Sequence, residues 1–294
     1  LPGSPLAGLR MDAVLGRLTS PGTPGPAVAS ADPTATWTST PEASASPSVG
    51  PSLNPSPTAA TLPLLHPAKV TITASGYWSW ALLNLRTGEI VGSGTPTTTS
   101  DTASMSKVWI AADYLRRAAE QGRTPNATIM GQLTTMIRDS DNTHAYEFHV
   151  ANGNLTSIKR MIKMCRLTET KGVQNSWSLT QMSTRDITRL AACVADGRAA
   201  GSRWTSWLLE QMRGVRGPGR FGVIEALPAE AAATTAIKNG WLLRDEDHLW
   251  HVSCLAVGDG WALGVHARYR NTLGKEYGAA ICRSVGQQLM AAPA

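Results

Sequence analysis

The feature that most limits the fold of this chain is an uneven distribution of proline. Eleven of the 18 prolines lie in the stretch Ser20–Pro67, where Asp32 and Glu42 are the only charged residues. Such a segment has too little apolar surface to offset the entropy lost on ordering, and its prolines keep it extended. We therefore expect residues 1–67 to form a disordered N-terminal segment and linker, and residues 68–294 to form one folded domain.

The chain has a net charge of +6, and the expected folded domain carries about +7 because residues 1–67 are slightly acidic. A nucleic-acid-binding protein usually concentrates such charge into Lys/Arg runs with interleaved aromatic residues. Here the basic residues are scattered, so we expect no nucleic-acid partner. Attraction to an anionic cell wall or membrane surface explains the charge better than nucleic-acid binding does. The sequence does not indicate an oligomeric state.

The four cysteines by themselves leave the redox compartment open. They are Cys165, Cys193, Cys254 and Cys282, and none forms a CxxC pair, which disfavours a zinc ribbon or a redox motif. The 28-residue separations of the first two and of the last two fit two structural disulfides, although three pairings stay open and four free thiols are the alternative. Together with the proline-rich stalk, they predict a secreted or cell-envelope protein.

Membrane spans, metals and cofactors are not expected. No run of about 18 apolar residues is present, and the chain opens with Leu1 rather than Met, so a leader was removed or the start lies upstream. No HExxH motif or phosphate-binding glycine loop occurs. His144 and His149 are five residues apart, which does not place them on one helical face, and we interpret His248 and His251 as surface residues.

Hydrophobic periodicity predicts an α+β domain. We expect a hairpin over 77–91, a block of helices, an antiparallel meander and a closing helix, with the first and last segments sharing one sheet. The crevice between this sheet and the helical lobe is where a site would form. The predicted helices cover 107–121, 128–138, 143–151, 155–165, 183–196, 203–213 and 275–290, and the predicted meander strands cover 234–243, 249–257 and 261–269.

Ser104 and Lys107 form the first of three short motifs that could carry chemistry. A spacing of three residues at a helix start places the lysine amine one turn from the serine hydroxyl on the same face. A serine hydroxyl needs a neighbouring base before it becomes a good nucleophile, and a desolvated lysine can be that base. Alone, Ser-x-x-Lys is a weak signal, because it is frequent by chance.

The other two motifs are equally ambiguous when taken singly. Ser140-Asp141-Asn142 could relay a proton and bind a substrate carbonyl, but these residues also cap helices and form turns. Lys238-Asn239-Gly240 lies in an expected strand, where a lysine is costly to bury and the glycine leaves room for a ligand. The alternative is an exposed edge-strand lysine followed by a bulge.

In this order, the three motifs resemble those of the class A β-lactamases and penicillin-binding proteins. The resemblance covers roughly residues 68–292 and looks closest to a short actinobacterial-type branch of β-lactamase-related serine hydrolases. Its further marks are Met136 and Ile137 before the second motif, Trp241 after the third, and Trp250, Val252 and Ser253 in the next strand.

The resemblance implies a role for each matched residue. Ser104 would be acylated with Lys107 as general base, while Ser140 would shuttle a proton and Lys238 would hold it in an electropositive setting. The substrate would be bound by Asn142, Asn239 and Gly240, with an oxyanion hole formed by the backbone N–H groups of Ser104 and Trp241.

Two departures from the family pattern affect the expected activity. The glutamate that activates the deacylating water belongs to a Glu-x-x-x-Asn pattern, and the nearest candidate here, Glu169, has Val173 four residues on. Asn239 stands where Thr or Ser usually donates to a substrate carboxylate. We expect it to alter specificity, because an amide can donate too. We expect Trp241 to narrow the cleft.

The resulting hypothesis is a serine acyl hydrolase that lacks the usual deacylating glutamate and for which efficient β-lactam hydrolysis is not expected. Its substrate would be a β-lactam, a cell-wall stem peptide or an ester. The alternatives are a D-alanyl-D-alanine carboxypeptidase or related peptidoglycan enzyme, and a catalytically quiet binding module with the same fold.

Overall fold

The computed structural model describes residues 64–290. Most of the segment that we predict to be disordered therefore lies outside the described residues. The described chain begins on the folded domain, since Leu65 is buried and the amide of His66 donates to the carbonyl of Leu289 over 2.8 Å. The last residues assigned to the linker thus pack on the domain.

The central element is a five-stranded antiparallel sheet with the order β2-β1-β8-β7-β6. The first strand pairs with the last along its whole length, with Tyr77 opposite Arg268 and Asn84 opposite Trp261. This confirms the predicted α+β fold, in which the two ends of the domain share a sheet. The strands are β1 (Tyr77–Asn84), β2 (Ile90–Gly92), β6 (Ala236–Leu243), β7 (Leu249–Gly258) and β8 (Trp261–Arg270).

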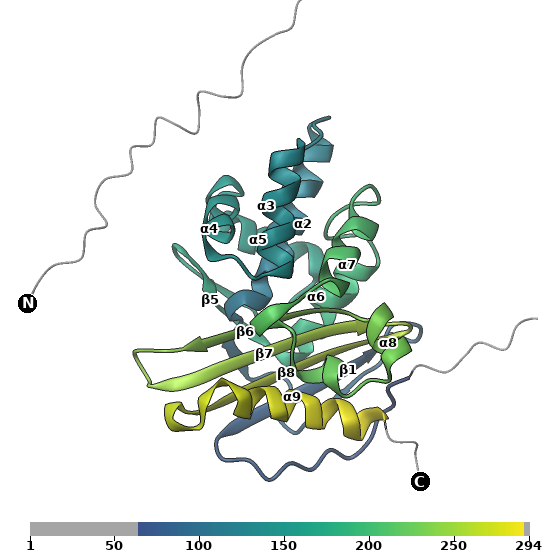
Figure 1. The fold of residues 1–294 in the computed structure, drawn as a ribbon, viewed down its shortest axis with the longest axis vertical. Helices are drawn as coiled ribbons and strands as arrows, with labels where there is room; N and C mark the ends of the chain where they lie inside the picture. Colours follow the sequence, from purple (N-terminus) through teal and green to yellow (C-terminus); the bar gives the residue numbers. More distant parts are fainter. Residues whose placement is uncertain (1–63, 291–294) are drawn as a thin grey trace, which may run out of the picture. The chain divides into compact units, whose positions relative to one another are not determined.

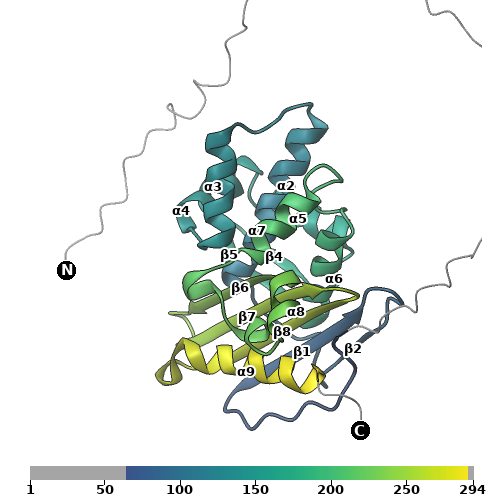
Figure 2. The same cartoon turned by 45° about the vertical axis from the view of Figure 1, so that its right-hand side comes forward.

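Helices cover both faces of this sheet (Figures 1 and 2). Gly264 of β8 packs on α6 (Thr184–Ala195), where a Cβ atom would lie 2.7 Å from that of Ile187. Tyr269, five residues on, donates from its hydroxyl to the carbonyl of Lys275 in α9 (Gly274–Met290) over 3.1 Å. Residues an odd number apart in a strand face opposite sides, so α6 and α9 lie on opposite faces.

Five further helices, α2 to α5 and α7, gather on the α6 side and form the helical lobe (Figure 2). Each begins and ends within two residues of its predicted bounds, because amphipathic periodicity marks these segments well. They are α2 (Lys107–Glu120), α3 (Ala127–Arg138), α4 (Asn142–Ala151), α5 (Leu155–Cys165) and α7 (Thr205–Arg213). Within residues 64–290, no helix combines the length and apolarity that crossing a membrane requires.

A second, three-stranded sheet was not predicted. It has the order β3-β5-β4, with β3 (Thr99–Asp101), β4 (Lys171–Val173) and β5 (Ser176–Ser183). Two of its strands have only three residues, too few to show a period, and the alternation in β5 is confined to residues 176–180. The prediction also missed α8 (Ala229–Thr234), which ends just before β6.

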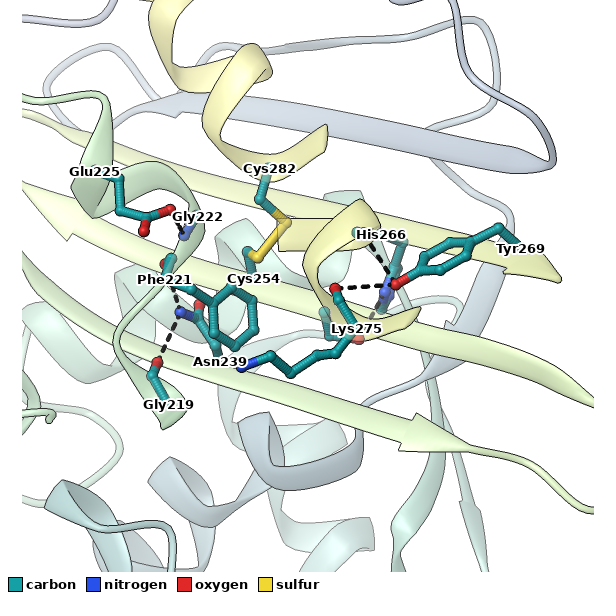
Figure 3. The surroundings of a disulfide bond; sticks show 12 residues. Gly219, Phe221, Gly222, Glu225, Asn239, Cys254, His266, Tyr269, Lys275 and Cys282 are labelled. Atoms are coloured by element: carbon teal, nitrogen blue, oxygen red, sulfur yellow. Dashed lines mark hydrogen bonds between the residues drawn. A yellow bond between two sulfur atoms is a disulfide. The ribbon is translucent and has the colours of Figure 1, made fainter. Parts of the chain in front are cut away.

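All four cysteines are paired, as expected, and the structure selects one of the three possible pairings. Cys165–Cys193 joins α5 to α6. Cys254–Cys282 joins β7 to α9, and Figure 3 shows it at the sheet face that α9 covers. Each disulfide therefore fastens a helix to its packing partner.

Candidate active site

Ser104 lies in a strained turn at the base of the helical lobe. It belongs to the 3-10 helix η1 (Ala103–Ser106), which leads directly into α2. Ala103 has a φ of +45° although it carries a side chain, and such strain tends to persist at functional sites. Ser104 is 9% exposed, and within the described chain its hydroxyl has no side-chain hydrogen-bond partner. The hydroxyl is thus free to meet a ligand.

Lys107 is fully buried one turn after Ser104. Its Nζ donates to the carbonyl of Ser140 over 2.5 Å and to Oδ1 of Asn142 over 2.7 Å, and lies 3.3 Å from Oγ of Ser140. Burial lowers the pKa of Lys107 to about 7, against the opposing effect of the charge of Asp141. Near neutral pH a large share of Lys107 is therefore an uncharged amine, which can accept a proton.

The Ser140-Asp141-Asn142 motif presents these acceptors from the loop between α3 and α4. Ser140 has a φ of +63°, a second strained position beside the first. Asp141 caps α4, since its side chain accepts from the amide of His144 over 2.8 Å. The Asp of the motif therefore caps a helix, while its Ser and Asn contact the amine of Lys107.

Lys238 approaches the same hydroxyl from the sheet. It is fully buried in β6, and its Nζ donates to Oγ of Ser140 over 3.0 Å. Burial, followed by the charge of Lys107, lowers its pKa well below that of a free lysine. Lys238 is therefore no exposed edge lysine. The two buried amines share one serine hydroxyl, and their repulsion disfavours protonation of both at once.

Gly240 lets the edge strand β6 approach the nucleophile. A Cβ atom at this position would collide with the carbonyl oxygen of Thr102 and would lie 2.7 Å from the amide nitrogen of Ser104. Only a glycine therefore fits here. The backbone of β6 at Gly240 and Trp241 consequently runs beside Ser104.

The expected role of Asn239 is wrong. Its amide nitrogen donates to the carbonyls of Gly219 (3.1 Å) and Phe221 (2.8 Å), and the residue is 1% exposed. Figure 3 shows it beside the disulfide of Cys254, its partner in the β6–β7 ladder. Side chains alternate along a strand, so Asn239 and Lys238 face opposite sides of the sheet. Asn239 thus holds a loop and has no N–H left for a substrate.

Trp241 also points away from Ser104. Its ring packs edge-on against Phe221 at 5.8 Å, and Nζ of Lys275 lies 5.3 Å from the ring centroid. The expectation that its side chain narrows the cleft is therefore wrong. Only its backbone remains a candidate contributor to the site.

Glu169 is committed to an ion pair. Arg185 contacts its carboxylate, and Oγ of Ser183 donates to it over 2.8 Å. Burial would raise the pKa of Glu169, but hydrogen bonds from Arg185, Thr168 and Ser183 outweigh it and lower the pKa to about 2. None of these partners belongs to the Ser104–Lys107 cluster, so Glu169 is a poor candidate for a base there.

Trp177 is a neighbour of the site that the sequence analysis missed. Nζ of Lys107 lies 4.9 Å from the centroid of its ring. Trp177 belongs to β5, one of the unpredicted strands, and is 70 residues from Lys107. Trp177 and Leu179 alternate with Ser and Thr residues, which could have placed Trp177 on a strand but gave no sign of its contact with Lys107.

His251 is not the surface residue that we expected. It is 2% exposed, its Nδ1 lies 3.2 Å from Asp101, and its Nε2 lies 2.9 Å from Asp247. Asp101 also accepts from Arg244 over 3.1 Å. This buried polar group ties the β6–β7 hairpin to the strand that precedes Ser104.

Comparison with solved structures identifies the fold of the domain. The TLA-3 extended-spectrum β-lactamase matches with a TM-score of 0.62 at 12% identity, over 74% of this chain and 94% of its own. A β-lactamase from Burkholderia vietnamiensis matches with a TM-score of 0.61 at 15% identity, over 74% and 90%. The domain has the β-lactamase fold. At such identities the likeness shows the fold alone.

Sequence comparison gives a second set of similar proteins. No family model matches the chain. A protein named "Putative lipoprotein LppW" from Mycobacterium tuberculosis (strain ATCC 25618 / H37Rv) is 28% identical over 188 residues, which is 61% of this chain. The same name and values apply to a protein from Mycobacterium bovis. The match spans 59% of the length of these relatives.

Proposed function

We propose that this domain is a serine acyl hydrolase of the β-lactamase and penicillin-binding type. Ser104 forms the acyl-enzyme, and Lys107 is its general base. The observation that carries the proposal is the pair of buried amines, Lys107 and Lys238, on the hydroxyl of Ser140, one turn from an unpartnered Ser104 hydroxyl. An unpaired buried amine is costly, so a fold that keeps two of them suggests a chemical task.

The hydrogen bonds of Lys107 suit it to remove a proton. An uncharged amine has two N–H groups and one lone pair. The N–H groups donate to the carbonyl of Ser140 and to Asn142. The lone pair is then available for the Ser104 proton, as Oγ of Ser104 bonds to the carbonyl carbon of the substrate.

Ser140 and Lys238 complete the proton path. Lys238 donates to Oγ of Ser140, which leaves the serine O–H free to act as a donor. As the bond between the carbonyl carbon and the leaving group breaks, Ser140 gives its proton to that group and regains one from Lys107. The backbone N–H groups of Ser104 and Trp241 stabilise the oxyanion, and loss of one such donor typically costs roughly 10²–10³ in rate.

The substrate is a carbonyl compound with a leaving group, such as a β-lactam, a cell-wall stem peptide or an ester. Because both N–H atoms of Asn239 are occupied, a substrate carboxylate would have to be bound by other groups. A relative named as a lipoprotein, two disulfides and the proline-rich stalk support a secreted or cell-envelope location.

One observation favours a second candidate, a D-alanyl-D-alanine carboxypeptidase or related peptidoglycan enzyme. Glu169, the nearest sequence candidate for a deacylating base, is held by Arg185 and Ser183. Without a dedicated carboxylate base, hydrolysis of a β-lactam-derived acyl-enzyme would be slow. The enzyme would then be inhibited by β-lactams while it turns over a peptide.

The test is intact-protein mass spectrometry after incubation with a fluorescent penicillin, an activated ester and a stem-peptide mimic. Ser104→Ala removes the nucleophile, and Ser206→Ala, at an exposed position of α7, is the matched control. We expect an adduct on the wild type and on Ser206→Ala but not on Ser104→Ala. Drug loss without an adduct would indicate a working β-lactamase. If no donor gives either an adduct or turnover, the proposal is wrong, and a catalytically quiet binding module with this fold is the remaining alternative.

A further inference from the structure

The ring of Trp177 lies against the buried base of the site, with its centroid 4.9 Å from Nζ of Lys107. We propose that Trp177 is a positioning residue that covers Lys107, keeping it an uncharged amine and keeping hydrolytic water away from it. The inference rests on the proposed function, because it concerns the base of the same site. It adds a prediction about the lifetime of the acyl-enzyme, which should be long while Trp177 covers Lys107.

The backbone around Trp177 is fixed to the turn that holds the nucleophile. Oγ of Ser106, fully buried, donates both to the carbonyl of Trp177 (3.2 Å) and to that of Ala103 (3.0 Å). Further along β5, the carbonyl of Thr180 accepts from the amide of Thr102 over 2.9 Å. These contacts on both sides of Ser104 hold β5 in place, so Trp177 is not a loosely placed surface side chain.

The ring of Trp177 has two opposing effects on Lys107. Its π face attracts a cation and so favours the protonated amine, whereas its bulk excludes water and so favours the uncharged amine. The pKa of Lys107 lies at about 7, with burial as the largest cause. The ring of Trp177 belongs to the surroundings that bury this amine, so we assign Trp177 the role of a cover.

The consequence concerns hydrolysis. To cleave the acyl-enzyme, a water must give a proton to a base while its oxygen bonds to the acyl carbon and the ester bond to Ser104 breaks. Glu169 is held by Arg185, so in this proposal Lys107, one turn after Ser104, is the base that would accept the proton of the water. A water that cannot reach Lys107 is not activated.

The experiment compares Trp177→Ala, Trp177→Leu and Trp177→Phe with the wild type. Trp78→Ala is the matched control, since Trp78 is a half-buried tryptophan on β1, which β8 and β7 separate from β6. Three quantities are measured: the pH midpoint of Ser104 acylation by an activated ester, the lifetime of the adduct, and the pH midpoint of Lys107 labelling by acetic anhydride. The last is read by peptide mapping and does not require acyl-enzyme formation.

We expect Trp177→Ala to raise both midpoints by about one pH unit or more and to shorten the adduct lifetime by about tenfold. Phe and Leu restore the cover and should stay near the wild type, as should Trp78→Ala. Unchanged midpoints and lifetime in Trp177→Ala, with Ser104 still acylated, would overturn the inference and leave the proposed function standing. A third outcome is that the wild type is not acylated, while the pH midpoint of Lys107 labelling is still low and rises in Trp177→Ala. The inference about Trp177 would then hold and the proposed function would be wrong.

Discussion

Nζ of Lys238 lies 3.0 Å from the hydroxyl oxygen of Ser140, although 98 residues separate the two along the chain. One residue belongs to the edge strand of the main sheet and the other to the loop between two helices of the lobe. Their hydrogen bond therefore joins the two halves of the fold at the candidate site. Substitutions near this hydrogen bond should change the rate of acylation more than the stability of the fold.

The charge of Asp141 should tune the base. Asp141 favours the protonated form of Lys107, so Asp141→Asn should lower the pKa of Lys107 further, by about 0.5 to 1 unit. The acylation rate should then reach half its maximum below pH 7, as measured with an activated ester across pH 5–9. Asn also caps helices well, so an unchanged urea midpoint is the control. A pH midpoint of acylation that is unchanged or higher in Asp141→Asn would contradict this electrostatic account.

Asn239 should prove structural. Asn239→Ala removes both hydrogen bonds to the 219–221 loop and leaves two carbonyls unsatisfied, at a cost of about 2–4 kcal/mol in the free energy of unfolding. Urea unfolding measures this loss, and Asn271→Ala, at an exposed position, should change stability little. A full retention of stability with a selective loss of affinity for carboxylate-bearing substrates would restore the role first inferred from sequence.

Acid should destabilise the domain through His266. Burial lowers its pKa from 6.5 to about 4. As the pH falls from 6.5 towards 4, the unfolded chain binds a proton that the folded chain does not, so the free energy of unfolding decreases. The loss from this residue is about 3 kcal/mol. Urea unfolding at several pH values measures it, and the slope should be shallower in His266→Gln. Equal slopes would show that other groups carry the effect.

The two disulfides should stabilise the domain by similar amounts. Each joins cysteines 28 residues apart, so the chain-entropy estimate is about 3.5 kcal/mol for either one. Double Cys→Ala variants of Cys165 and Cys193, and of Cys254 and Cys282, should each lose about this much by urea unfolding. Reaction of the unreduced wild type with a thiol reagent, leading to a mass increase, would contradict the pairing.

Sequence patterns predicted the fold where periodicity was strong. The helix Lys107–Glu120 and the two paired strands β1 and β8 were predicted, because their apolar residues recur at helical or strand spacing. The short strands of the second sheet were not predicted. Thr99–Asp101, for example, has only three residues, and all of them are polar. Such strands are defined by their partners rather than by their own composition.

The candidate site was predictable only as far as its motifs reach. Ser104, Lys107, Ser140 and Lys238 were found by order and spacing, and the structure brings Lys107, Ser140 and Lys238 into contact. Which face a strand residue occupies was not visible, since Lys238 and Asn239 are adjacent in sequence yet point to opposite sides of the sheet. Contacts such as those of Trp177 and His251 arise only from tertiary packing.

The central claim is that Lys107 is the base that activates Ser104. The most direct measurement is the rate of Ser104 acylation by an activated ester as a function of pH, in the wild type and in Lys107→Met. In the wild type the rate should rise with pH and reach half its maximum near pH 7. In Lys107→Met it should fall by roughly 10²–10⁴ and lose that dependence. A variant that acylates Ser104 at the wild-type rate, with the same pH profile, would contradict the account.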